Sequence, residues 1–149
     1  MSYYEHAEEL QYYAEEPPIQ RAFGTAYNIG LDLATTIDTS ITEGQQYIEL
    51  DFGVVLEAPP GYWLMVVPRS STFKKWGLIM ANSVGIIDPS YCGPKDTIRA
   101  LFLTTKEVYI PKGTRLVQVL CIPMKLATVV HHSTVPARAS RGDIGSTGD

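Results

Sequence analysis

The stretch from Ile48 to Pro68 reads IELDFGVVLEAPPGYWLMVVP and holds two β patterns on either side of a turn. Every second residue from 48 to 54 is apolar, with acidic residues or glycine between, which is the period of a strand with one buried face. A Pro-Pro-Gly sequence at 59–61 then marks a turn. Residues 62–67 are nearly all apolar and rich in β-forming types, which predicts a strand buried on both faces.

The rest of the chain repeats this texture of short apolar runs between turn residues. We expect further strands over 84–87, 97–103, 108–110, 116–122 and 127–130, with the first two joined as a hairpin with a long tip. The chain is therefore predicted to be all-β, a sandwich or barrel.

The composition describes one ordinary globular domain. The chain has 149 residues, of which 45% are hydrophobic, enough for a single core. Its formal net charge of -4 excludes the broad basic face that long nucleic acids need. No apolar run reaches the roughly 20 residues of a membrane helix, and no signal peptide opens the chain, so we expect no membrane contact and a cytoplasmic location. Cys92 and Cys121 lack the spacing of a disulfide framework or zinc site.

The two ends differ in composition from the body. Residues 1–18 form an acidic, tyrosine-rich leader that ends at Pro17-Pro18, and it is predicted to be a solvated leader, a frayed helix or an extended arm. Residues 19–135 carry the β pattern. Residues 136–149 contain almost nothing apolar, so we expect a flexible C-terminal arm.

One short helix is expected over 72–76, with Ser70 or Ser71 as its cap and Gly77 at its end. Pro68, Arg69 and the two serines at this strand-to-helix junction offer a guanidinium, hydroxyls and backbone N–H groups, which suit an oxyanion such as phosphate. The same residues are also compatible with a plain helix cap beside a surface arginine.

Two aspartates and the tail are candidates of the same kind. Asp88 follows an apolar strand and precedes a turn, where it is either a functional carboxylate or a turn-forming residue. Asp32 interrupts an apolar run, and solvent exposure explains it equally well. Arg141 and the Gly-Ser-Thr-Gly sequence at 145–148 combine a cation, two hydroxyls and flexible backbone, which suit an anion but also describe a disordered end. The adjacent His131 and His132 point to opposite sides of an extended chain and carry no metal-binding signal.

Taken together and in order, these segments resemble the motifs of the trimeric dUTPase family. The resemblance extends from about residue 18 to 148, and five motifs in the family's order make it specific. They are Asn28–Ala34, Pro68–Ser71 followed by Trp76–Leu78, Asn82–Gly93, Gly113–Gln118, and the tail from Arg141 to Gly148.

The resemblance implies a jelly-roll-like β-sandwich of the β-clip type and a homotrimer with active sites between subunits, each closed by the tail of a neighbour. It implies hydrolysis of dUTP to dUMP and pyrophosphate, which limits uracil entry into DNA and supplies dUMP for thymidylate synthesis. Asp88 is then the general base that activates water for attack on the α-phosphorus. Mg²⁺ is the implied cofactor, and Asp32 contacts it through a metal-bound water.

The resemblance also assigns the other site residues. Arg69 supports the catalytic carboxylate. Residues that contact phosphates are Ser70, Ser71, Gln118, Arg141, Ser146 and Thr147, and residues that hold uracil or deoxyribose are Asn82, Gly85, Ile87, Tyr91 and Ile144. Tyr91 packs under the sugar and leaves no room for a 2′-hydroxyl.

Three segments depart from the family pattern: Asp143-Ile144 replaces the usual uracil-covering Phe, Thr114 replaces a common acidic residue, and Gly93–Thr97 differs from the usual return strand. Two alternatives remain. One is a catalytically weak or idle nucleotide sensor or protein-binding regulator, with residues 1–18 as the partner surface. The other is a dCTP deaminase, disfavoured because the segment from Thr97 to Phe102 lacks the glutamate that this chemistry needs.

Overall fold

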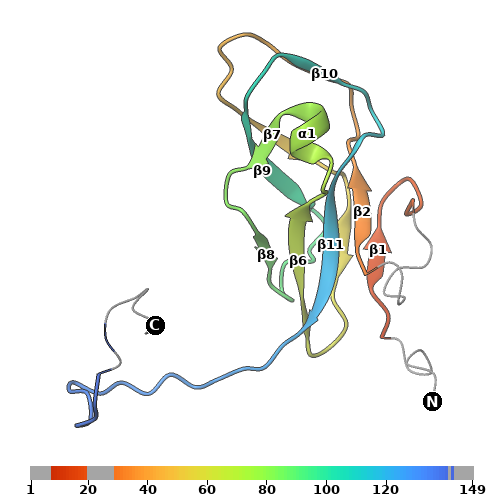
Figure 1. The fold of residues 1–149 in the computed structure, drawn as a ribbon. Helices are drawn as coiled ribbons and strands as arrows, with labels where there is room; N and C mark the ends of the chain where they lie inside the picture. The colour runs from red at the N-terminus through yellow and green to blue at the C-terminus, as the bar shows by residue number, and fades with distance from the viewer. Residues whose placement is uncertain (1–7, 20–28, 141, 143–149) are drawn as a thin grey trace.

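The computed structural model describes residues 8–19, 29–140 and 142, and within these ranges it is built of strands and one short helix. Figure 1 shows their arrangement. The elements are β1 (Gln11–Tyr13), β2 (Leu31–Ala34), β3 (Thr39–Ile41), β4 (Tyr47–Asp51), β5 (Val55–Glu57), β6 (Tyr62–Pro68), α1 (Thr72–Trp76), β7 (Leu78–Met80), β8 (Gly85–Ile87), β9 (Arg99–Thr104), β10 (Val108–Ile110) and β11 (Arg115–Pro123).

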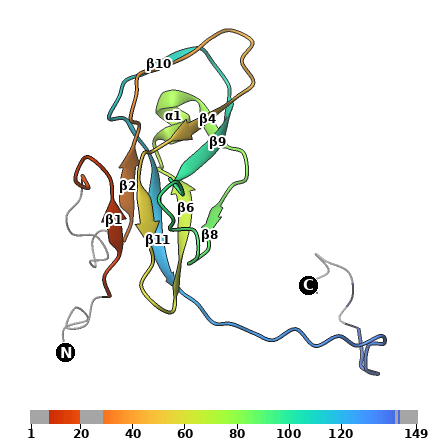
Figure 2. The same cartoon turned by 180° about the vertical axis from the view of Figure 1, so that it is seen from behind.

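All pairings among these strands are antiparallel, as an all-β sandwich requires. A four-stranded sheet has the order β2-β11-β6-β8, a three-stranded sheet has the order β4-β9-β7, and β1 with β5 and β3 with β10 form two ribbons. Buried residues of both larger sheets belong to one hydrophobic core, which includes Leu64 and Val119 of the first and Phe102 of the second. The two sheets are thus the layers of a sandwich (Figures 1 and 2), and the predicted fold class is confirmed.

Strand β6 has one buried face and one half-buried apolar face. Leu64 and Val66 are each 1% exposed, whereas the side chains between them are only half-buried, so the prediction of burial on both faces is wrong for this chain alone. Residues opposite one another in register share a face of a sheet. Three strands therefore build one outer apolar face, composed of Trp63, Met65, Val67, Ile86, Leu120 and Ile122.

The alternating pattern from 48 to 54 gives the expected inward burial, but β4 ends at Asp51 and β5 begins only at Val55. Gly53 adopts a left-handed φ of +65°, and its N–H donates to Asp51 Oδ1 at 2.8 Å, so the chain bends between β4 and β5.

The predicted hairpin of 84–87 with 97–103 is wrong in its pairing. β8 pairs with β6, whereas β9 pairs with β4 and β7 in the other sheet. Two turns between them, closed by Tyr91 N–H to Asp88 O and Asp96 N–H to Gly93 O, carry the chain from one sheet to the other. Register and pairing are non-local, so alternation along one segment cannot reveal them.

Residues 127–130 do not form the strand that was predicted for them. Val129 is 93% exposed and Val130 is 69% exposed, because the chain leaves the body after β11 and no strand accompanies it (Figure 1). Apolar residues alone cannot make a strand where no pairing partner lies beside them.

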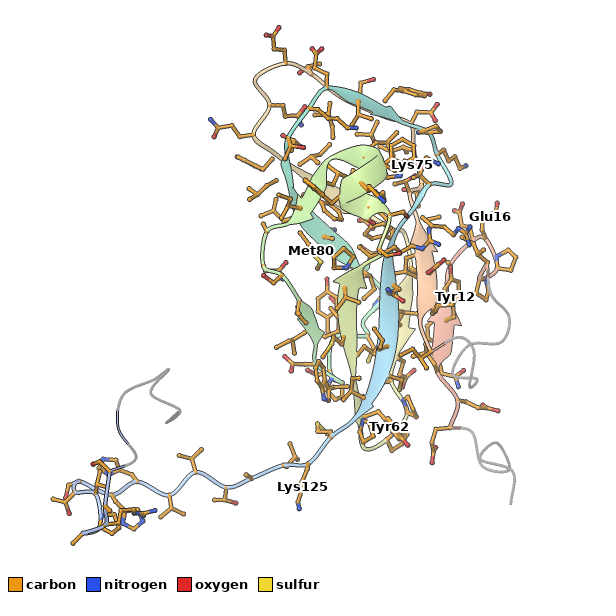
Figure 3. All side chains as sticks on the ribbon, in the orientation of Figure 1. Tyr12, Glu16, Tyr62, Lys75, Met80 and Lys125 are labelled. Carbon is orange, nitrogen blue, oxygen red and sulfur yellow. The ribbon has the colours of Figure 1, made fainter. Side chains whose placement is uncertain are left out.

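The acidic leader contributes a strand to the body. β1 pairs with β5, and the Tyr13 hydroxyl donates to Glu57 Oε2 at 3.2 Å. Leu10 and Tyr12 pack against the core, and burial raises the pKa of Tyr12 (Figure 3). The leader is thus an extended arm over 11–13. Within the described residues no helix is long and apolar enough to cross a membrane.

The β3–β10 ribbon ends in a loop closed by Asp38. The backbone N–H of Lys112 donates to Asp38 Oδ1 at 2.7 Å, and this bond, with a second from the Tyr109 hydroxyl, lowers the pKa of Asp38. The same hydrogen bond to Asp38 raises the pKa of Tyr109.

We predict that Asp38→Asn lowers the melting temperature at pH 7 and that this difference shrinks as the pH falls below about 4. A carboxylate whose folded pKa is depressed stabilises the protein above its unfolded pKa, and this contribution is lost as pH falls through the folded pKa. Thermal unfolding of the wild type and of Asp38→Asn from pH 3 to 7 measures the difference in melting temperature. A difference in melting temperature that is constant over this range would contradict the assignment.

Candidate active site

The helix α1 places two serines at the end of β6. The helix ends where Gly77 takes a left-handed φ of +65° and its N–H reaches Phe73 O at 2.8 Å, as predicted. Ser71 is the N-cap, but its side chain makes no capping hydrogen bond. The buried Thr72 hydroxyl donates to Leu116 O at 2.6 Å and ties the helix to β11. The Ser71 hydroxyl is therefore not used for capping and is available to a ligand.

Asp32 is buried and lies between two arginines. Its carboxylate accepts from Arg69 Nε at 3.1 Å and from Arg115 Nη1 at 3.2 Å, and the residue is only 7% exposed. The solvent-exposure alternative for Asp32 is thus wrong. The ion pairs join the carboxylate on β2 to the segments after β6 and at the start of β11. Because two guanidiniums face one carboxylate, the group keeps a net positive charge, which suits an anion.

Gln118 lies beside this group at the middle of β11. It is level with Asp32 on one neighbouring strand and with Val67 on the other, and its amide Nε2 approaches Pro68 O at 3.5 Å. A Cβ on Gly30 would lie 2.3 Å from Gln118 Oε1. Any other residue at position 30 would therefore displace the Gln118 side chain. We call these neighbouring residues the anion-side cluster: Asp32, Arg69, Ser70, Ser71, Arg115 and Gln118.

A tight turn between β7 and β8 holds the residues predicted to bind uracil. Asn82 Nδ2 donates to Val84 O at 3.1 Å, and Ser83 has a φ of +60°, a conformation that non-glycine residues rarely adopt. Gly85 is buried against Val66, where an added Cβ would meet the Val66 Cβ at 3.1 Å. Ile87 is half-buried opposite Leu64. The turn is therefore closely held by hydrogen bonds of its own and by its packing against β6.

Asp88 and Tyr91 follow β8 in the next turn. Both are exposed, and the Tyr91 N–H donates to Asp88 O at 3.0 Å. The Tyr91 hydroxyl donates to Thr97 O at 3.0 Å, which fixes the ring. Asp88 thus closes the turn through its main-chain carbonyl and is exposed, and its functional role stays a prediction.

The anion-side cluster and Asp88 lie at opposite ends of β6. Ile87 is opposite Leu64, so Asp88 is level with Trp63, whereas Arg69 follows the other end of the strand. At about 3.3 Å per residue, six residues separate them by about 20 Å. Figure 1 shows the end of β8 and α1 at the two ends of β6. Within one chain Arg69 is therefore far from Asp88 and pairs with Asp32, and its supporting role beside the catalytic carboxylate stays a prediction.

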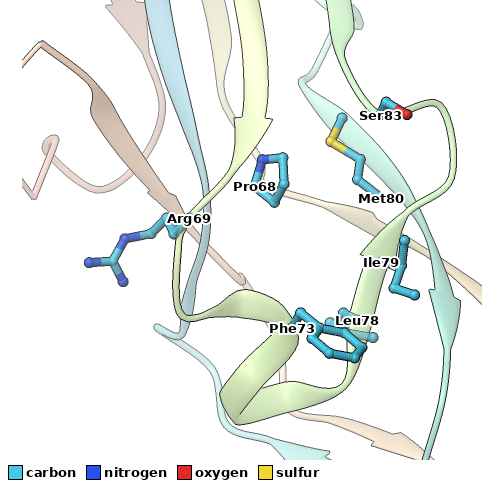
Figure 4. Close-up of a pocket in the computed structure, with 7 residues that line it drawn as sticks. All are labelled: Pro68, Arg69, Phe73, Leu78, Ile79, Met80 and Ser83. Atoms are coloured by element: carbon cyan, nitrogen blue, oxygen red, sulfur yellow. The ribbon is translucent and has the colours of Figure 1, made fainter.

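A pocket of about 360 Å³ lies between α1 and β7 and is mostly apolar. Figure 4 shows its lining residues and also shows that the Arg69 guanidinium points away from the others. This pocket is therefore not the anion site. It is lined by Pro68, Arg69, Phe73, Leu78, Ile79, Met80 and Ser83.

The predicted tail residues Arg141, Ile144, Ser146 and Thr147 lie outside the described residues. Two residues to which the sequence analysis gave no role belong to the site. Arg115 follows the Pro-Lys-Gly turn at 111–113, and Thr72 follows the two serines. Their proximity to quoted motifs was the available signal, but only the pairing of β11 with β2 and β6 brings Arg115 to Asp32.

The described residues contain no group of three or more His, Cys, Asp or Glu side chains that could hold a metal ion. The acidic residue of the anion-side cluster, Asp32, is already bonded to two arginines. This donor set fits an ion that arrives on a ligand and is approached through water, rather than one held by the protein alone.

The fold and the site define a class: a β-sandwich protein with an anion-binding cluster at one end of a central strand and an exposed carboxylate, Asp88, at the other. The tight turn at 82–84, which we call the nucleoside-type turn, precedes β8 and lies towards the end that carries the cluster. A family model described as dUTPase matches residues 20–148. The chain belongs to the dUTPase family.

Relatives and solved structures agree with this membership. The SPbeta prophage-derived deoxyuridine 5′-triphosphate nucleotidohydrolase of Bacillus subtilis is 35% identical over 118 residues, covering 79% of this chain and 82% of the relative. The deoxyuridine 5′-triphosphate nucleotidohydrolase of Hydrogenobaculum sp. is 32% identical over 127 residues, covering 85% of this chain and 88% of the relative.

Two structures extend the comparison to the fold. The crystal structure of dUTPase from Streptococcus mutans matches with a TM-score of 0.63 and 31% identity, over 72% of this chain and 88% of that one. The dUTPase of Staphylococcus bacteriophage 80alpha with dUPNHPP matches with a TM-score of 0.73 and 19% identity. The match covers 95% of this chain and 99% of that one and shows that the two share a fold.

We predict that Asp32→Asn lowers the free energy of unfolding by about 1–3 kcal/mol, since it removes the charge that two arginines compensate. The loss stays below that of a fully buried pair because both guanidiniums are partly exposed. Glu49→Gln is the matched control, because Glu49 pairs with Arg99 on the surface at 3.7 Å. Urea unfolding at pH 7 compares the two, and equal losses would contradict the structural role of Asp32.

Proposed function

We propose that this protein hydrolyses dUTP to dUMP and pyrophosphate. The observation that carries the proposal is the pairing of an anion-side cluster with a closely held nucleoside-type turn in a chain of the dUTPase family. Two relatives of this chain are deoxyuridine 5′-triphosphate nucleotidohydrolases, and a protein of the same fold was solved with dUPNHPP.

Asp88 is the proposed general base. Its carboxylate is exposed at the end of β8, so it is accessible to a water molecule and can take the water's proton. The oxygen of that water then bonds to the α-phosphorus while the bond from this phosphorus to the α–β bridging oxygen breaks. Pyrophosphate leaves with that oxygen, and dUMP keeps the new one.

The anion-side cluster is the proposed holder of the triphosphate. Arg115, the Ser70 and Ser71 hydroxyls and the Gln118 amide supply donors, and tail residues Arg141, Ser146 and Thr147 add to them from residues 136–149 of a neighbouring subunit. Bound to the triphosphate, Mg²⁺ would supply positive charge against the negative charge of the phosphates. Asp32 is the residue of this chain that would face its water shell.

The turn between β7 and β8 is the proposed uracil site. Backbone groups of Asn82 to Ile87 face the base, Ile144 of the tail covers it, and the Tyr91 ring lies against the sugar. A rigid ring in that position excludes a 2′-hydroxyl by contact, which selects the deoxyribonucleotide.

The separation within one chain supports a homotrimer with shared active sites, which the family resemblance implies. Asp88 is about 20 Å from the anion-side cluster of its own chain, too far to act on a phosphate held there. A cyclic trimer packs one face of each subunit against a different face of the next, which can bring Asp88 of one copy to the cluster of another. The outer apolar face supports association, because a solvated sheet face is normally polar.

We predict that Asp88→Asn reduces pyrophosphate release from dUTP by at least about a thousandfold, because an amide cannot accept the proton. Binding of dUTP should change little, since the turn and the cluster are intact. Release is measured with magnesium for dUTP, dCTP, dTTP and UTP. If wild type binds dUTP without hydrolysing it, the protein is a nucleotide sensor, and if Asp88→Asn stays active, another group is the base.

We also predict that two inactive variants restore activity when they assemble together. Asp88→Asn and the double variant S70A/S71A each damage one half of the site. Random mixing reunites two intact halves from different subunits in about a quarter of the sites, so about a quarter of wild-type activity should return. Sedimentation must show each variant as a trimer. If mixing restores nothing, the site lies within one chain.

A further inference from the structure

The turn that carries Tyr91 is anchored by a carboxylate far away in sequence. Asp51 lies at the end of β4, and its Oδ2 accepts from the Thr97 hydroxyl at 2.9 Å and from Arg99 Nε at 3.1 Å. Its other oxygen accepts from the Gly53 N–H at 2.8 Å. One carboxylate therefore holds two chain segments together at the end of the 88–98 crossing.

Main-chain bonds make this end of the crossing rigid. The Phe52 N–H donates to Ile98 O at 3.0 Å, and the Ile98 N–H donates to Val54 O at 2.8 Å. The Ile98 side chain is fully buried. Thr97 is thus restrained in two ways: it precedes the buried Ile98, and its hydroxyl is bonded to Asp51. The Thr97 carbonyl therefore has a fixed position.

That carbonyl is the acceptor for the Tyr91 hydroxyl, at 3.0 Å. Tyr91 also donates its N–H to Asp88 O, so one residue links the start of the crossing to its anchored end. The intervening residues close a turn of their own, in which the Gly93 N–H donates to Asp96 Oδ2 at 2.8 Å. This is the segment, 93–97, in which the sequence departs from the family pattern.

We propose that Asp51, acting through Thr97, is a positioning residue that sets the place of the Tyr91 ring and thereby the preference for deoxyribose over ribose. The proposal rests on the proposed function of Tyr91. Asp51 touches neither the sugar nor the reacting phosphorus. It determines how closely the ring can approach the sugar, and a ring held about 1 Å too loosely leaves space for a 2′-hydroxyl.

Thr97→Val tests the anchor, because valine keeps the shape and the main-chain acceptor but removes the hydroxyl. We expect the ratio of the dissociation constants for UMP and dUMP to fall about tenfold, while Thr97→Ser keeps the wild-type ratio. Asp51→Asn should resemble Thr97→Val, because its amide would place a donor against Arg99 Nε. Glu49→Gln is the matched control, since Glu49 pairs with the same arginine through Nη1.

A double-mutant cycle separates positioning from general destabilisation. Tyr91→Phe removes the hydroxyl bond to Thr97 O, so Thr97→Val should change the ratio no further in that background. The proposal would be overturned if the effects of the two substitutions on the ratio multiplied in the double variant. It would also be overturned if folded Thr97→Val kept the wild-type ratio, or if the wild type bound UMP and dUMP equally.

The monophosphates keep this test independent of hydrolysis. A wild type that prefers dUMP to UMP but does not hydrolyse dUTP contradicts the proposed catalytic function and leaves the test of Asp51 intact. Conversely, the wild type could hydrolyse dUTP while Thr97→Val keeps the wild-type ratio of dissociation constants. That result contradicts only the role of Asp51.

Discussion

The pairing of β6 with β11 determines where everything else lies. Seven residue pairs join these strands, from Val117 with Pro68 to Pro123 with Tyr62. β11 is also hydrogen-bonded to β2, and β6 to β8, so both halves of the candidate site depend on this ladder. Inward side chains of both strands, such as Leu64, Val66 and Val119, are almost fully buried. The site residues thus stand on the rigid part of the sandwich, where burial holds the backbone.

The same ladder keeps the two halves of the site apart. The anion-side cluster gathers where β6 ends and β11 begins, and the turn with Asp88 lies at the other end of β6. No movement of one loop can close about 20 Å, because the strand between them is part of the core. A second subunit is therefore the simplest way to complete the chemistry. The half-buried outer apolar face meets the other requirement, since it offers surface that association can bury.

Much of the fold could be predicted because it is encoded locally. The turn residues at 59–61 and 111–113, the alternation from 48 to 54 and the glycine after α1 each specify nearby backbone. What failed was non-local. The pairing of β8 with β6 instead of β9 depends on which sheet each strand joins, and residues 127–130 have strand-forming side chains without a partner strand.

The site follows the same division. Ser70, Ser71 and Asp88 occur in recognisable segments, so the sequence alone could nominate them. Asp32 could not be interpreted in the same way, because an aspartate between leucines is compatible with either solvent or a buried ion pair. Its two arginines come from segments 37 and 83 residues away in the chain, counting from position 32 to 69 and to 115. The fit of Gly30 against Gln118 is equally invisible without the sheet.

The departure from the family pattern at 93–97 changes how the turn that carries Tyr91 is held. Residues 93–97 form a self-closed turn through Asp96, and Thr97 is then fastened to Asp51 of the other sheet. A crossing without regular secondary structure has backbone freedom, which would loosen the Tyr91 ring unless something restrains its far end. Asp51 supplies that restraint with three hydrogen bonds from two segments. Since the carboxylate is partly exposed, each bond alone is weak in water, but together they fix one carbonyl, which is all that the Tyr91 hydroxyl needs.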